Sequence, residues 1–140
     1  MKRILAYVAI GLCAVGTLCA ETASPQEAQD VVTAHIDSDG VQRVRIVGGD
    51  YFFKPRQVVV KANVPVALEV VKEAGIAPHT FVIDAPSAGI VVDQTLGTEP
   101  RTIAFTPTIP GRYPFYCRNR LLLFKSHRDR GMEGVLEVVP

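Results

Sequence analysis

The sequence contains no tryptophan, only three cysteines, and no clear excess of charge of either sign. Lysine and arginine number 15 and aspartate and glutamate number 14, which gives a net charge of +1. Such an even balance lacks the basic surface that is typical of nucleic-acid-binding domains. We therefore expect no nucleic-acid partner.

Long uninterrupted helical segments are also lacking, because ten prolines and 11 glycines are spread along the 140 residues. This spacing disfavours a helix bundle and favours short strands joined by turns. The length is that of one domain, and 48% apolar residues argue against disorder. We expect a single all-β domain.

The N-terminus has the layout of a secretory signal peptide. Lys2 and Arg3 precede an uncharged run, Ile4 to Ala20, and we expect cleavage after Ala20. The run is 17 residues long, at the lower end of the roughly 17–25 residues that span a bilayer, so a permanent anchor is the weaker alternative. Acylation of Cys19 is disfavoured because Leu18 before it is not small.

These features predict residues 1–20 as a signal peptide, 21–30 as a flexible lead-in and 31–140 as one domain. The mature protein would be exported to the periplasm without a membrane anchor. It would carry 13 basic and 14 acidic residues and would keep Cys117 alone of the three cysteines. A single cysteine forms no internal disulfide, so Cys117 is an intermolecular, buried or chemically recruited thiol.

Short apolar segments separated by proline, glycine and aspartate predict seven or eight strands and hence a β-sandwich or barrel. The first two flank a turn at 37–40 and should form a hairpin. Residues 87–98 fit a strand, a helical turn or a loop. The expected strands cover residues 31–36, 41–47, 58–61, 66–72, 80–84, 101–106, 112–117 and 134–139.

Alternation along two of these strands brings chemically active residues to the apolar side. Tyr113, Phe115 and Cys117 share one face, which the two aromatic rings mark as the core side. His79 shares a face with Phe81 in the same way. A thiol and an imidazole are thus expected at the ends of buried faces.

Cys117, His127 and Met132 follow one another within 16 residues, and His79 begins an earlier strand. A thiolate, two imidazoles and a thioether are the ligands of a trigonal copper site with a weak axial sulfur. Each residue also has a plainer interpretation. Cys117 and Met132 could be core side chains, and either histidine could be structural.

The residues from Gly111 to Cys117, then His127 and the segment 131–138, resemble the C-terminal half of a cupredoxin. Phe53-Lys-Pro55 and Pro78-His-Thr-Phe81 resemble its first half, so the resemblance covers roughly residues 41–139. It implies a Greek-key β-sandwich of seven or eight strands that binds one copper ion, alternating between Cu(I) and Cu(II). His79, Cys117 and His127 would be the equatorial ligands and Met132 the axial one, with Thr80 where the family often has asparagine.

The chain departs from the family in the loop between two of these ligands. Nine residues separate Cys117 from His127, more than in familiar cupredoxins. A longer loop costs little closure entropy, but it can change ligand angles, metal lability and potential. Whether the copper centre is blue, green or red therefore stays open.

The long loop itself is basic and apolar. Residues 118–130 contain a single acidic residue, Asp129, and five basic ones, Arg118, Arg120, Lys125, Arg128 and Arg130. The run is either a solvated face or a surface that steers an acidic redox or copper-transfer partner to a site near Arg118–Arg130. The segment 121–124, Leu-Leu-Leu-Phe, is either core under the long loop or an exposed docking patch, and we expect at least two of its side chains in the core.

Other motifs carry weaker signals. His35 has no partner pattern, and Asp37 and Asp39 fit a turn better than a calcium loop, which would need a later glutamate. A Cys117–His127 nucleophile pair is disfavoured because such cysteines usually open a helix. Zinc is chemically possible, but methionine is a poor zinc ligand.

We therefore expect no enzyme but a periplasmic electron-transfer protein, with His127 near the surface as the electron's exit. The first alternative is a copper-handling protein that sequesters or delivers the ion. The second is a metal-free β-sandwich that acts as an interaction module.

Overall fold

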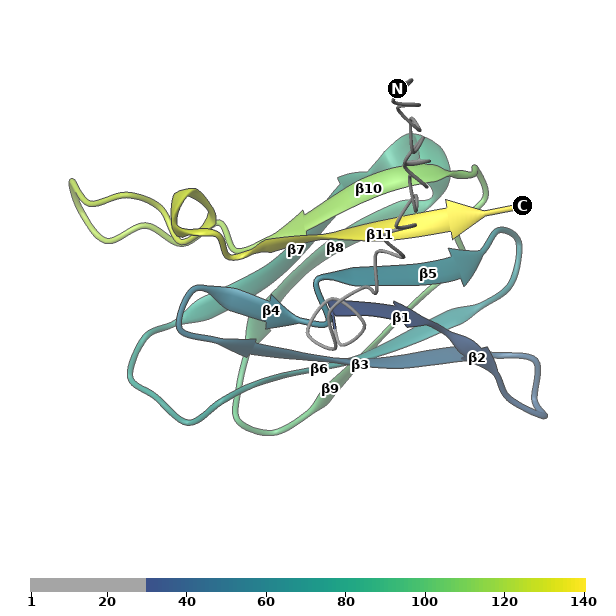
Figure 1. Ribbon diagram of the computed structural model, residues 1–140, viewed down its shortest axis with the longest axis horizontal. Coiled ribbons are helices and arrows are strands. Elements are labelled where there is room, and N and C mark those ends of the chain that lie inside the picture. The colour runs from purple at the N-terminus through teal and green to yellow at the C-terminus, as the bar shows by residue number, and fades with distance from the viewer. Residues whose placement is uncertain (1–29) are drawn as a thin grey trace, which may run out of the picture.

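A computed structural model describes residues 30–140, which form two β-sheets packed face to face (Figure 1). One sheet has the strand order β1-β5-β11-β10-β7-β8, and the other has the order β2-β3-β6-β9 with β4 paired to β3. The elements are β1 (Val31–Thr33), β2 (His35–Ile36), β3 (Gln42–Gly49), β4 (Phe52–Lys54), β5 (Gln57–Lys61), β6 (Val66–Lys72), β7 (His79–Ala85), η1 (Pro86–Ala88), β8 (Ile90–Leu96), β9 (Arg101–Phe105), β10 (Gly111–Tyr116), η2 (Arg128–Arg130) and β11 (Glu133–Val139). The predicted all-β sandwich is confirmed.

Eleven strands are present in this part of the chain, against the seven or eight expected. The strand expected at 31–36 is split at Ala34, where the chain crosses from one sheet to the other. β1 pairs with β5, whereas β2 pairs with β3. β4 was not predicted because three residues are too short to show alternation, and the ambiguous segment 87–98 contains the end of η1 and all of β8.

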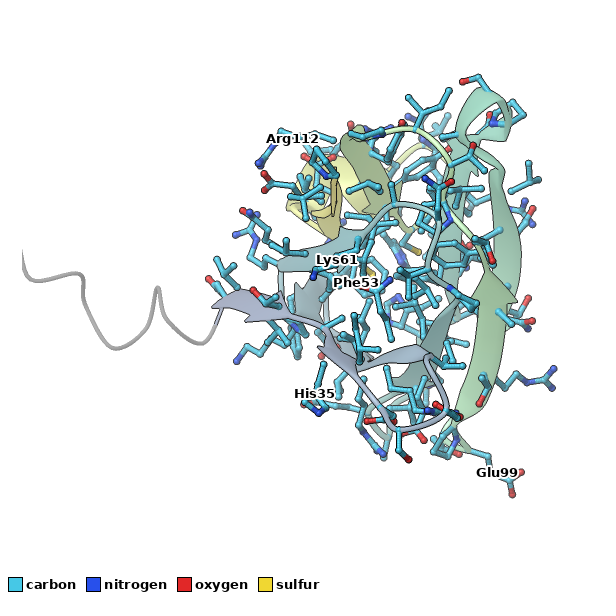
Figure 2. The ribbon with its side chains drawn as sticks, turned by 90° about the vertical axis from the view of Figure 1, so that its right-hand side faces the viewer. His35, Phe53, Lys61, Glu99 and Arg112 are labelled. Atoms are coloured by element: carbon cyan, nitrogen blue, oxygen red, sulfur yellow. The ribbon has the colours of Figure 1, made fainter. Side chains whose placement is uncertain are left out.

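The core lies between the two sheets, and alternation selects the side chains that enter it. In β3, Val44 and Ile46 are buried while Arg43 and Arg45 are exposed. In β11, Leu136 and Val138 are buried, as predicted. Figure 2 shows Phe53 between the sheets and Glu99 pointing away from them.

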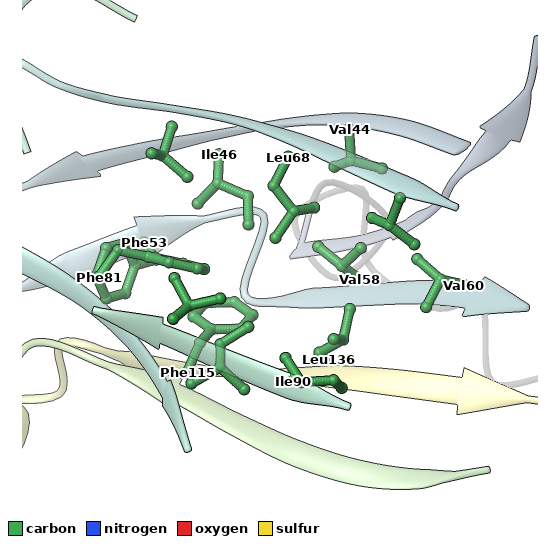
Figure 3. Packing of buried hydrophobic residues seen from close by; sticks show 14 of the residues in the cluster. Val44, Ile46, Phe53, Val58, Val60, Leu68, Phe81, Ile90, Phe115 and Leu136 are labelled. Carbon is green, nitrogen blue, oxygen red and sulfur yellow. The ribbon is translucent and has the colours of Figure 1, made fainter. Parts of the chain in front are cut away.

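Three phenylalanines from three strands form the aromatic part of the core (Figure 3). The ring centroids of Phe53 lie 5.5 Å from those of both Phe81 and Phe115, which are 5.1 Å apart. Phe81 lies two residues after His79, and Phe115 lies two residues before Cys117. The cluster therefore supports the backbone on which those two side chains are mounted.

The hairpin between β2 and β3 closes one end of the sandwich, as predicted. Arg43 pairs with both Asp37 and Asp39 at 2.7 Å, and Asp39 also accepts a hydrogen bond from the Val41 N–H. The Arg43 hydrogen bond lowers the pKa of Asp39 to about 2. Both aspartates thus serve the turn, and His35 beside them is exposed.

The predicted signal peptide, residues 1–20, lies outside the described residues, as does all but the last residue of the lead-in. Within residues 30–140, no helix combines the length and the apolar character needed to cross a membrane.

Candidate metal centre

Four residues from three parts of the chain meet at the end of the sandwich opposite the β2–β3 hairpin. His79 begins β7 and Cys117 directly follows β10. β10 is antiparallel to both β7 and β11, so the end of β10 lies beside their starts. His127 precedes η2, and Met132 directly precedes β11. The topology therefore brings together all four residues that the sequence singled out.

The donor atoms of three of these residues point at one another. The two Nδ1 atoms of His79 and His127 are 3.1 Å apart, and the Cys117 Sγ lies 3.5 Å from the His127 Nδ1 and 4.0 Å from the His79 Nδ1. All three residues are buried. Metal–ligand bonds of about 2.0–2.3 Å, with angles of roughly 100–120° between them, would set the donors of a near-trigonal site roughly 3–4 Å apart. The three donors therefore fit a single small ion between them.

Met132 is fully buried at the same end of the core. Its carbonyl accepts a hydrogen bond from the Cys117 N–H at 3.0 Å, and its own N–H donates to the His127 carbonyl at 3.0 Å. Gly48 leaves room for its side chain, since a Cβ there would lie only 3.3 Å from the Met132 Cε. The backbone thus ties Met132 to two of the three converging residues.

The Cys117 sulfur and the loop that follows it are held by Thr80 and Asn119. The Thr80 N–H donates to the Sγ at 3.3 Å, and the Thr80 hydroxyl accepts from the Arg118 N–H at 3.1 Å. The same hydroxyl lies 3.1 Å from the Asn119 Oδ1 and 3.7 Å from the Sγ, and its single proton serves the shorter bond. Asn119 Nδ2 in turn donates to the Pro78 carbonyl at 2.9 Å, which joins the loops that carry His79 and Cys117.

Sequence analysis did not identify Asn119. Its position two residues after Cys117 was visible, but an asparagine in a polar loop gives no sign of which backbone carbonyl it will meet. Thr80 stands where the family often has asparagine, and in the structure its hydroxyl joins the two loops together with Asn119.

Burial lowers the pKa of both histidines below the ordinary value of 6.5. For His79 the neighbouring His127 and Lys72 lower the pKa further, and for His127 the charge of Arg130 does so. Both imidazoles are therefore neutral at neutral pH, with lone pairs to offer. A neutral imidazole is the form that binds a metal.

The family model of the cupredoxin-like domain matches residues 9–131, which is most of the chain. This protein belongs to the cupredoxin-like domain family. The resemblance stated from the motifs is thereby confirmed. No curated protein matches the chain.

Solved structures share the fold at low sequence identity. The metal-binding domain of the Streptococcus pneumoniae Cu(I)-exporting P-type ATPase CopA, determined with Cu(I), has a TM-score of 0.60 at 19% identity, covering 79% of this chain and 96% of its own. Auracyanin A, a "blue" copper protein of Chloroflexus aurantiacus, has a TM-score of 0.53 at 17% identity, and the match covers 71% of this chain and 100% of auracyanin A. A multicopper oxidase has a TM-score of 0.58 at 16% identity, covering 80% of this chain but 48% of its own. These similarities establish the fold alone.

In this cupredoxin, His127 lies at an open cleft of about 660 Å³. His127 is 7% exposed, and it reaches solvent at this cleft. The Tyr51 ring packs edge-on against the imidazole at 5.1 Å, and the Arg130 guanidinium lies over the Tyr51 ring at 4.6 Å. The side chain is covered by these neighbours and approaches solvent only where it lines the cleft, between the 76–78 loop and the 118–125 loop.

The long loop of this cupredoxin extends away from the two sheets (Figure 1). The two ends of the loop meet at Asn119 and His127, where the His127 N–H donates to the Asn119 carbonyl at 2.8 Å. We call this closed base of the loop its neck. The expectation that at least two of the residues 121–124 enter the core is wrong. Leu121, Leu122, Leu123 and Phe124 are 64%, 81%, 103% and 59% exposed, because the closed neck holds them beyond the reach of the core.

Most of the basic residues in this loop have carboxylate partners. Arg118 pairs with Asp93, Arg120 lies 3.6 Å from Asp129, and Arg128 lies 2.8 Å from Glu133. Lys125 and Arg130 have no carboxylate within 4.0 Å in the described part of the chain. The local excess of positive charge is therefore smaller than the sequence suggests.

Proposed function

We propose that this cupredoxin is an exported, periplasmic electron-transfer protein that holds one copper ion. Its ligands would be His79, Cys117 and His127, with Met132 as the weak axial ligand. The observation that carries the proposal is the convergence of two Nδ1 atoms and one Sγ in a buried site. Copper bound there would supply a one-electron couple between Cu(I) and Cu(II).

The surroundings of the donor atoms suit such a couple. The β-strands and the aromatic cluster fix the backbone of His79 and Cys117, and the Thr80 N–H orients the sulfur. Ligand positions that are held from outside need little rearrangement when the charge at the centre changes. Fast electron transfer is the function that gains most from that rigidity.

Catalysis on a bound substrate finds less support. Cys117 follows a strand instead of opening a helix, and its side chain is 0% exposed. A nucleophilic cysteine needs both access and a lowered pKa. Some relatives of this fold are enzymes, a multicopper oxidase among them, so the proposal concerns this site and not the fold.

Copper handling is the second candidate, and the cleft at His127 is the observation that favours it. A cleft beside one ligand gives a chelating partner a route to the ion, and the long loop between Cys117 and His127 could open that route. The two functions differ in what reduction does. An electron carrier keeps its copper as Cu(I), whereas a delivery protein releases it to a competing chelator.

The experiment is a Cu(II) titration of the chain from Glu21 onward, followed by visible absorption and EPR spectroscopy. We expect one copper ion per chain and a thiolate-to-copper absorption band that bleaches on reduction and returns on reoxidation. Cys117→Ala should abolish the band. His35→Gln is the matched control, because this third histidine is exposed and lies at the opposite end of β3.

Loss of the ion to a Cu(I) chelator on reduction would establish copper handling in place of electron transfer. Absence of both binding and band would leave a metal-free sandwich. A band that persists in Cys117→Ala would overturn the ligand assignment.

A further inference from the structure

The tip of the long loop, Leu121 to Phe124, is an exposed apolar surface that the proposed copper chemistry does not use. Ile76 on the neighbouring loop is fully exposed as well, and it lines the same cleft as Leu121 and Phe124. Five of the ten exposed large apolar residues in the described part of the chain therefore gather at the metal-centre end. Singly scattered apolar residues are ordinary on a surface, but a cluster marks an interaction site.

The loop is built to present this tip. The bond between His127 and Asn119 closes its neck, and Asn119 is tied in turn to the Pro78 carbonyl. Beyond the neck, a turn is closed by the Phe124 N–H, which donates to the Leu121 carbonyl at 3.0 Å. The tip is thus anchored at its base, while its four side chains remain largely in solvent.

Positively charged side chains flank this tip along the chain, and another lies at the cleft that the tip borders. Lys125 directly follows Phe124 and has no carboxylate within 4.0 Å in the described residues, and neither has Arg130 at the cleft. Arg120 immediately precedes the tip and is held only by a 3.6 Å pair with Asp129. The other two basic side chains of residues 118–130 are neutralised, since Arg118 pairs with Asp93 and Arg128 with Glu133.

We propose that residues 121–124 insert into the surface of an anionic lipid membrane, with Lys125, Arg120 and Arg130 facing the lipid phosphates. An apolar tip with cations set behind it matches the two layers of a membrane interface, hydrocarbon below and phosphate above. A protein partner would need a pocket deep enough for four consecutive protruding side chains. Shallow insertion needs no such pocket, and the turn already pairs one backbone N–H and carbonyl of the tip.

This mode of docking would hold the metal centre at the membrane surface. His127 and the tip border the same cleft, so the copper ligands would lie just above the phosphate layer. The inference concerns the surface of the loop and does not depend on which copper function is correct.

The first test is co-sedimentation of the chain from Glu21 onward with vesicles. One set contains phosphatidylcholine alone and the other contains equal parts of phosphatidylcholine and phosphatidylglycerol. We expect clear binding to the anionic vesicles and much weaker binding to the neutral ones. The double variant Leu122→Ser/Leu123→Ser should lower the partition coefficient about tenfold or more.

Two further variants separate the apolar and the electrostatic contributions. Lys125→Gln should lower binding to the anionic vesicles about fivefold and leave binding to the neutral ones unchanged. Val91→Ser is the matched control for lost apolar surface. Val91 is 71% exposed and lies toward the end of β8 opposite the one that pairs with His79, so this variant should bind like the wild type.

The absence of tryptophan allows a second readout. Phe124→Trp introduces the single tryptophan of the protein at the tip, and its emission should shift to the blue on addition of anionic vesicles. Val91→Trp should show no shift. Unchanged emission of Phe124→Trp, or equal binding by the wild type and the double serine variant, would overturn the inference.

An acidic protein is the competing occupant, and immobilised polyglutamate is its probe. Retention on polyglutamate without binding to either kind of vesicle would replace the lipid assignment with the acidic partner. The copper spectrum of the same samples keeps the proposals separate. A normal copper band without vesicle binding overturns only the docking inference, whereas vesicle binding without a band overturns only the copper function.

Discussion

Two buried polar sites lie at opposite ends of β3, and their partners differ in kind. At the start of the strand, the Gln42 side chain donates to the carbonyls of Lys61 and Val64 and accepts from the Lys61 N–H. Beyond the other end, the partners of the His79 and His127 Nδ1 atoms within residues 30–140 are each other and the Cys117 sulfur. Both sites are buried, with Gln42 only 1% exposed.

The difference separates a structural polar group from a ligand site. An amide fixed by backbone donors and acceptors has its hydrogen-bonding capacity filled by the fold itself, which is how a buried polar group normally avoids a desolvation penalty. One sulfur and two imidazole nitrogens aimed at one point have few backbone partners in the described part of the chain, the Thr80 N–H at the sulfur being one. This convergence, and not burial alone, identifies the metal-centre end.

The largest effect is expected from removing the aromatic support beneath the metal-centre end. Phe115→Ala deletes a fully buried ring that packs on Phe53 and Phe81. The free energy of unfolding should fall by about 3–5 kcal/mol, because the cavity adds to the lost burial. Urea unfolding followed by circular dichroism measures the loss, and Phe115→Leu should lose less. A loss below about 1 kcal/mol would show that the cluster is not a rigid support.

The next effect tests the structural polar site. Gln42→Met keeps the approximate size of the side chain but leaves the Lys61 N–H without its acceptor. We expect a loss of about 1–3 kcal/mol in the free energy of unfolding. The copper band should stay unchanged, since Gln42 lies at the opposite end of β3 from Gly48, which borders Met132. A changed band would break the proposed separation of the two ends.

A smaller loss of stability but a larger spectral change is expected from Thr80→Val. The substitution keeps the shape of the side chain and removes the hydroxyl that joins Arg118 and Asn119. Unfolding should be easier by about 1 kcal/mol. The thiolate-to-copper band should shift, because the segment that positions Cys117 loses this tie. Thr80→Ser retains the hydroxyl and should keep the band, and an unshifted band in Thr80→Val would assign the hydroxyl a purely structural role.

The mildest perturbation is a change of pH, which alters protonation but substitutes no residue. Burial lowers the pKa of His79 and His127 in the folded protein, so the unfolded chain takes up protons first as the pH falls below about 6.5. The metal-free protein should therefore have full stability above that pH and lose it progressively below. The carboxylate of Asp39, with a pKa of about 2, plays no part in this range.

Urea unfolding of the metal-free protein at pH 7.5 and pH 5.5 measures this dependence. His79→Gln/His127→Gln should show a flatter response over the same range. An equally steep response in that double variant would assign the pH dependence to other groups.

Much of this protein could be predicted from its residues because the signals are local. The alternation of Phe115 and Cys117 placed a thiol on a buried face, and the motif around His127 and Met132 indicated the cupredoxin fold. The turn at Asp37 and Asp39 followed from the preference of these side chains for nearby backbone groups. The family membership and the sandwich are both confirmed.

Other features depend on contacts between distant segments, which no local pattern contains. The split at Ala34 arises because the Ala34 N–H donates to the Val59 carbonyl between pairings with two different sheets. The exposure of Leu121 to Phe124 follows from a neck closed by one backbone bond. The tie from Asn119 to Pro78 spans 41 residues.

The sequence by itself thus determined the fold class and the four residues that meet at the metal-centre end. Periodicity is a property of neighbouring residues, and donor chemistry is a property of each residue. Only the tertiary structure decided how close the donor atoms lie, that His127 is covered by Tyr51, and that the apolar loop stands outside the core. These features depend on which sheets pair and where a loop closes. Such long-range contacts form only when the whole chain has folded.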